Sequence, residues 1–154
     1  MNSRQFPQLI VGVDRSPGGR AALRVAAAEA IRRDMPLHAV HVRSFMRGPV
    51  DDFTDIDAAF HEAFGGFPPG LDVRRAILDT PVVAALTGRA CHPGDLLVLG
   101  SGRGRVTHRW RRLLSPSTVR GCLRLACCPV LVVSAGGARR WWTGVPDTGE
   151  LERI

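Results

Sequence analysis

Two short stretches of the chain carry residue types that bind charged ligands in proteins. The first is Asp14, a carboxylate directly after the apolar run Leu9–Val13. The second is Gly100-Ser101-Gly102-Arg103-Gly104, which follows the apolar run Leu96–Leu99. Closely spaced glycines let backbone N–H groups approach an oxyanion such as phosphate, and arginine adds donors that can bind phosphate in pairs. If the two apolar runs are neighbouring strands, the carboxylate and the glycine-rich stretch meet at one crevice.

The rest of the chain alternates apolar runs with helical patterns. Ser16-Pro17 joins a capping serine to a proline that suits the first helical position, and Ser115-Pro116 repeats this signal. The predicted order is a strand followed by a helix, four times, and then a final strand. The predicted strands are residues 9–14, 37–42, 71–78, 95–100 and 129–133, and the predicted helices begin near residues 16, 51, 80 and 115.

This alternation predicts an α/β fold with a doubly wound sheet of five parallel strands and helices on both faces. Near-continuous apolar strands are typical of a parallel sheet buried on both sides, and its crossovers are right-handed. The 154 residues suffice for one domain, which we place at residues 8–135. Residues 136–154 are predicted to be a C-terminal tail. Because exposing both Trp141 and Trp142 is costly, we expect them to dock on a partner subunit or to cover an exposed sheet edge.

Four stretches, in this order, resemble the universal stress protein family, of the adenine nucleotide alpha hydrolase-like superfamily. The resemblance implies the strand order 3-2-1-4-5, which places Asp14 beside the glycine-rich stretch. It also implies homodimers, commonly paired through the last strand, here Val130–Val133. Many members of the family bind ATP and others do not. The matching stretches are Ile10–Leu23, Leu37–Val42, Asp95–Ser101 and Cys128–Val133.

The chain departs from the pattern of the ATP-binding members, which is Gly, two residues, Gly, nine residues, then Gly-Ser or Gly-Thr. Gly100 matches the first glycine, but Arg103 stands where the second belongs. Ser115-Pro116 replaces the later pair, and the intervening loop is longer and basic. Pro116 has no N–H, and losing one charge-assisted donor costs roughly 1.5–3 kcal/mol. The five arginines between Gly100 and Ser115 oppose this loss because they add phosphate donors.

The candidate nucleotide-binding residues lie at the ends of three predicted strands and at the start of the last helix. The resemblance implies that Asp14 lies near the nucleotide and that Val42 touches the adenine. Simpler roles stay open, because Asp14 also suits the cap of the turn after its strand and Val42 suits core packing. The full set is Gly12, Val13, Asp14, Val42, Gly100, Ser101, Gly102, Arg103, Gly104, Ser115, Ser117 and Thr118.

The formal charge of +7 comes from one segment. Residues 101–125 hold seven arginines and no acid, whereas Asp51–Glu62 is acidic. A basic patch attracts anionic partners, so nucleic-acid binding through Arg103–Arg124 is an alternative function, with Trp110 available to stack a base. It is the less favoured one, because the basic segment coincides with the phosphate loop of the family and the acidic stretch would repel a polyanion.

Several other classes of protein are not expected. No apolar run approaches the roughly 18 residues of a membrane span, and Met1–Phe6 lacks the apolar core of a signal peptide. The four cysteines are consistent with a reducing cytoplasm. The five histidines have no metal-binding spacing, so no metal site is predicted. No Ser-His-Asp arrangement has a recognisable context, so no catalytic residue is predicted either.

We therefore predict a cytoplasmic, homodimeric universal stress protein with a role in stress-response regulation. ATP or another adenine nucleotide is the candidate ligand, with Mg²⁺ as its candidate companion near Asp14. Enzymatic activity is expected to be weak ATP hydrolysis at most. A second alternative is a dimeric protein-interaction module that has lost ATP binding.

Overall fold

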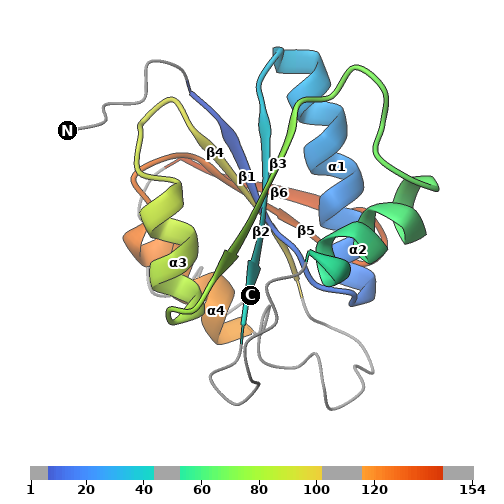
Figure 1. Cartoon of the computed structure of the whole chain (residues 1–154). Coiled ribbons are helices and arrows are strands. Elements are labelled where there is room, and N and C mark those ends of the chain that lie inside the picture. The colour runs from blue at the N-terminus through green and yellow to red at the C-terminus, as the bar shows by residue number, and fades with distance from the viewer. Residues whose placement is uncertain (1–6, 44–52, 102–115, 144–154) are drawn as a thin grey trace.

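Six strands of the described part of the chain lie side by side in one sheet, with helices on both of its faces (Figure 1). The computed structural model describes residues 7–43, 53–101 and 116–143. Along the chain the elements are β1 (Leu9–Gly12), α1 (Pro17–Arg33), β2 (Leu37–Val42), α2 (Thr54–Phe64), β3 (Val73–Leu78), α3 (Val82–Arg89), β4 (Leu96–Gly100), α4 (Pro116–Leu125), β5 (Val130–Val133) and β6 (Arg139–Trp142).

The strand order is β3-β2-β1-β4-β5-β6. The first five strands are parallel to one another, which confirms the predicted α/β fold and the order 3-2-1-4-5. The prediction of five strands was incomplete, because β6 adds an antiparallel strand beside β5. None of the helices in the described ranges is long and apolar enough to cross a membrane.

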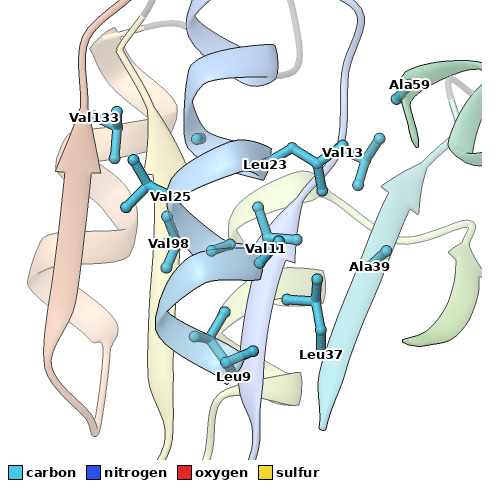
Figure 2. Packing of buried hydrophobic residues seen from close by; sticks show 14 of the residues in the cluster. Leu9, Val11, Val13, Leu23, Val25, Leu37, Ala39, Ala59, Val98 and Val133 are labelled. Carbon is cyan, nitrogen blue, oxygen red and sulfur yellow. The ribbon is translucent and has the colours of Figure 1, made fainter. Parts of the chain in front are cut away.

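The two faces of the sheet bury two separate apolar clusters. Alternate residues of β1 point to opposite faces, so Leu9 and Val11 pack with α1 and α2 whereas Ile10 packs with α3 and α4. Figure 2 shows Leu9, Val11 and Val98 beneath α1. Because β1 and β4 are buried on both faces, their sequences are continuous apolar runs rather than alternating ones.

Helix α1 begins as its sequence predicts. The Ser16 hydroxyl accepts a hydrogen bond from the Gly19 N–H at 2.9 Å, and Pro17 occupies the first turn, where its missing N–H is not needed. At the other end, Arg32 and Arg33 lie in the last turn, near the negative pole of the helix dipole. The helix therefore starts immediately after the carboxyl end of β1.

The turn between β1 and α1 packs directly against the end of β4. A Cβ atom added to Gly100 would lie 2.5 Å from the Gly18 carbonyl oxygen and 2.8 Å from the Gly19 nitrogen. A Cβ atom on Gly18 would lie 2.5 Å from the Ser101 carbonyl oxygen. The two backbone segments meet so closely that neither glycine has room for a side chain.

The strand β6 lies within the segment that the sequence assigned to a tail. Of the two expectations for Trp141 and Trp142, the structure shows the second, because the strand that carries them pairs with β5 and covers its outer edge. Trp142 is buried among the α3 and α4 cluster, and Trp141 is 45% exposed on the other side of the strand.

Replacing Gly100 by alanine should destabilise the protein, because the new methyl group meets rigid backbone rather than a flexible side chain. We expect a loss of about 1–3 kcal/mol in the free energy of unfolding, measured by urea denaturation. Gly88→Ala is the control: Gly88 lies in α3 with nothing within 4 Å of an added Cβ, so its replacement should leave stability equal or slightly higher. Equal effects of the two substitutions would contradict the close approach.

Candidate functional site

The candidate site lies where the strand order reverses. From β1 the chain passes through α1 to β2 on one side, and from β4 it passes through α4 to β5 on the other. The two connecting helices cover opposite faces of the sheet, α1 on one and α4 on the other (Figure 1). In open α/β sheets this divergence leaves a crevice beyond the carboxyl ends of the two strands, which is where ligands bind.

Asp14 occupies this position, immediately beyond β1. Its side chain is 2% exposed, and its Oδ1 accepts hydrogen bonds from the Ser16 N–H at 3.0 Å and the Ser16 hydroxyl at 2.5 Å. An added Cβ on Gly19 would lie only 1.9 Å from this oxygen. The simpler role expected for Asp14, a cap of its own turn, is therefore filled by Oδ1.

The second oxygen of Asp14 is different. Oδ2 is buried and has no hydrogen-bond partner among the described residues. Burial raises the pKa of Asp14 above its ordinary value, against the weaker opposing effects of the Ser16 hydrogen bonds and the charge of His41. A buried polar atom without a partner is costly, so Oδ2 is an acceptor that a ligand could use.

His41 is the site residue that the sequence analysis missed. It lies near the end of β2, is buried, and places Nδ1 at 3.1 Å from the Val13 carbonyl oxygen. Its Nε2 lies 3.3 Å from Asp55 Oδ2, near the start of α2. Both ring nitrogens thus face oxygen atoms, and the ring ties β1 to α2 beside Asp14. The spacing of the histidines addresses only metal binding; the adjacency of β1 and β2 brings His41 near Val13 but does not indicate its contact with Asp55.

The glycine-rich stretch enters the site only in part. Gly100 ends β4 against the β1–α1 turn, as the resemblance implied. The Ser101 N–H donates to the Val133 carbonyl oxygen at 2.8 Å, so this donor extends the pairing of β4 and β5. Gly102, Arg103, Gly104 and Ser115 lie outside the described residues, and their role stays a prediction.

The remaining candidate residues lie in the sheet, in its apolar core and at the start of α4. Gly12 pairs with Val40 inside the sheet, and the Val13 N–H donates to the Val40 carbonyl oxygen at 2.8 Å. Val42 is buried in the α3 and α4 cluster, so its simpler role in core packing is realised. Thr118 is buried in the first turn of α4, the helix that also contains Ser117.

Two acidic residues of the stretch near the site, Asp57 and Glu62, are paired with arginines of the chain. Glu62 pairs with Arg15 and lies 3.9 Å from an amino group of Arg20, both close to the β1–α1 turn. Asp57 pairs with Arg75 at 2.8 Å. In the part of the chain that the structure describes, no group of three or more histidine, cysteine or acidic side chains is arranged to hold a metal ion.

Comparison with known proteins confirms the resemblance that the sequence suggested. Residues 5–64 match the model of the Universal stress protein family. No curated protein matches the chain. The fold is shared with solved universal stress proteins, and three of them illustrate the range of similarity.

One is a universal stress protein in complex with cAMP, with 23% identity and a TM-score of 0.60 over 84% of this chain and 98% of that chain. Another is the universal stress protein UspA from Lactobacillus plantarum, with 24% identity and a TM-score of 0.52 over 85% and 99% of the two chains. The third is a universal stress protein from Archaeoglobus fulgidus in complex with dAMP, with 18% identity and a TM-score of 0.52 over 82% and 97%.

The raised pKa of Asp14 predicts a pH-dependent effect on stability. The folded chain binds the proton of the Asp14 carboxyl group more tightly than the unfolded chain does. The contribution of Asp14 to the free energy of unfolding is therefore fully present below about pH 4. It is lost as the pH rises through the raised pKa. An asparagine side chain cannot ionise, so the stability of Asp14→Asn relative to the natural chain should increase between about pH 4 and pH 7.

Urea denaturation of both proteins across this pH range measures the effect. If the free energies of unfolding of Asp14→Asn and of the natural chain change in parallel with pH, ionisation of the buried carboxyl group does not destabilise the protein, and the prediction is wrong.

Proposed function

We infer that this chain is a universal stress protein, and we propose that it binds an adenine nucleotide at the carboxyl edge of β1 and β4. The observation that carries the proposal is Asp14 Oδ2, a buried acceptor without a hydrogen-bond partner among the described residues, at the point where the strand order reverses. Two structurally similar universal stress proteins have been solved with cAMP and with dAMP, which supports an adenine nucleotide as the ligand class.

The chemistry of Asp14 suggests which part of the nucleotide it meets. An oxygen that lacks a donor suits a ligand group that donates, such as a ribose hydroxyl or the amino group of adenine. A phosphate would be repelled by a carboxylate, so the nucleoside end belongs at Asp14. Val42 lies at the end of the neighbouring strand β2, where its apolar side chain could contact the adenine ring.

The phosphates would then extend toward the segment between β4 and α4. This segment carries five arginines between Gly100 and Ser115, together with Gly102 and Gly104. Guanidinium groups bind phosphate oxygens in pairs, and they could replace the N–H that Pro116 lacks. Ser115, Ser117 and Thr118 supply hydroxyl groups near the start of α4.

ATP is the specific ligand that we propose, because a chain of three phosphates can use more of these arginines than a single phosphate can. Mg²⁺ would arrive with the nucleotide and be held chiefly by its phosphates. The proposal is one of binding, with ATP hydrolysis weak at most. A cytoplasmic, stress-related regulatory role, with a protein partner that senses the bound nucleotide, belongs to the same proposal.

Isothermal titration of the full chain with MgATP, AMP and cAMP tests the site. We expect saturable binding, and we expect Asp14→Asn to weaken it about tenfold, since a hydrogen bond to a charged group contributes roughly 1.5 kcal/mol. Asparagine keeps an oxygen that can accept from Ser16 but presents an N–H₂ group in place of Oδ2. The substitution therefore changes the ligand-facing atom more than the turn.

Asp72→Asn is the matched control for this experiment. Asp72 lies just before β3, beside a hollow of about 190 Å³ at the end of the sheet where β2 and β3 begin. Its substitution should leave nucleotide affinity unchanged. Absence of binding at millimolar MgATP, AMP and cAMP would refute the proposal and leave the interaction module. Oligonucleotide binding that disappears steeply with added salt would instead favour nucleic acid.

A further inference from the structure

We propose that the outer side of α4 and the nearby strand β6 form a docking surface for an acidic segment of a partner protein. The surface consists of Arg120 and Arg124 of α4 and Arg140 of β6, and is called the basic surface below. It would receive the protein partner that the proposed function calls for, so the proposal rests on that function. Its test contains no nucleotide and therefore does not depend on the nucleotide site.

The topology leaves one side of α4 open toward β6. Helix α3 packs on β1 and β2, and the sheet continues from β4 through β5 to β6, so β6 lies on the side of α4 away from α3. Gly121 of α4 faces α3, because an added Cβ would lie 2.9 Å from a methyl group of Val83. Arg120 and Arg124 lie one turn apart on the outer side of the helix, away from this contact.

Strand β6 adds Arg140 on the same face of the sheet. Alternate residues of a strand point to opposite faces, and Trp142 packs in the α3 and α4 cluster, so exposed Arg140 lies on that face as well. Its guanidinium lies 5.1 Å from the centre of the Trp142 ring, and this cation–π contact holds it in place. Arg139 points to the other face, where it lies 3.9 Å from Glu29 of α1.

The basic surface has no acidic residue close to it in the described part of the chain. Between residues 80 and 143 the sequence holds one acid, Asp95. It is 1% exposed and accepts hydrogen bonds from the N–H groups of Gln8 and His92. On the side of α1 and α2, by contrast, Arg15 pairs with an acid of α2, and so does Arg75. The positive charge of the basic surface is thus left for a partner.

Two buried donors of the same elements also lack acceptors. The Nε of Arg120 and the Nε1 of Trp142 are buried and have no hydrogen-bond partner among the described residues. Buried polar atoms are nearly always paired, so these two add to an excess of donors over acceptors. A partner that brings acceptor atoms matches this excess.

The chemistry of the surface favours a protein partner. Carboxylates of aspartate and glutamate are acceptors that guanidinium groups bind in pairs. Leu125, at the end of α4, is 63% exposed and offers an apolar contact beside Arg124. Nucleic acids use exposed aromatic rings to stack their bases, whereas Trp142 on this face is buried and Trp141 is exposed on the other face, beside α1. A single exposed leucine is also little apolar area for a membrane.

Fluorescence anisotropy of a fluorescein-labelled peptide of ten glutamates, titrated with the full chain, tests this surface. We expect saturable binding that weakens as salt is added. Replacing the two exposed arginines together, Arg124→Gln with Arg140→Gln, should weaken the binding about fivefold, because each exposed ion pair contributes modestly.

Arg24→Gln with Arg74→Gln is the matched control. It removes the same amount of charge from two exposed arginines, one on α1 and one on β3, and should change the affinity by less than about twofold. Circular dichroism establishes that both double variants keep their helices and strands.

Three results would overturn the proposal. One is the absence of saturable binding. Another is equal weakening by the two double variants, because the peptide would then sense only the net charge of the chain. The third is tighter binding, at the same salt concentration, of a ten-nucleotide oligothymidylate or of phosphatidylserine vesicles, lost in Arg124→Gln with Arg140→Gln. That result would assign the surface to a nucleic acid or to a membrane.

Discussion

The contact on which the rest of this structure depends is that between the β1–α1 turn and the end of β4. The Gly18 carbonyl oxygen and the Gly19 nitrogen lie against Gly100, and the Ser101 carbonyl oxygen lies against Gly18, so neither Gly18 nor Gly100 has room for a side chain. This contact fixes the start of α1 relative to the sheet, and with it the position of the Ser16 cap and of Asp14. Asp14 is buried in the turn that this contact positions.

Much of the fold could be predicted from the sequence, because β1, β4 and β5 are continuous apolar runs and the start of α1 carries a serine cap and a proline. The strand β6 could not, since Arg-Arg-Trp-Trp has neither β-branched residues nor a clear alternation of apolar and polar side chains. Its pairing follows from the Ser134–Ala138 turn and from the burial of Trp142, which are tertiary effects. The expectation that these tryptophans could cover a sheet edge was correct because it rested on the cost of exposing them.

The features of the site that depend on which strands are neighbours could be predicted from the sequence. The features that depend on side-chain contacts could not. Asp14 and Gly100 come together because β1 and β4 are neighbours. The role of His41 depends on which carbonyl and which carboxylate its ring reaches, and no spacing in the sequence encodes that. The two oxygens of Asp14 also differ: one accepts hydrogen bonds within the turn, and the other is buried without a partner among the described residues, a difference that arises only in the folded chain. The role of the arginine-rich segment between β4 and α4 stays a prediction.

The position of the tryptophans has a spectroscopic consequence. The chain has no tyrosine, and two of its three tryptophans are Trp141 and Trp142, on the last described strand. Apart from Trp110, the ultraviolet emission of the protein therefore originates at the edge strand β6, from one buried ring and one exposed ring. Emission and circular dichroism therefore report on different parts of the same molecule. Emission changes when β6 separates from β5, whereas circular dichroism changes when the helices unfold.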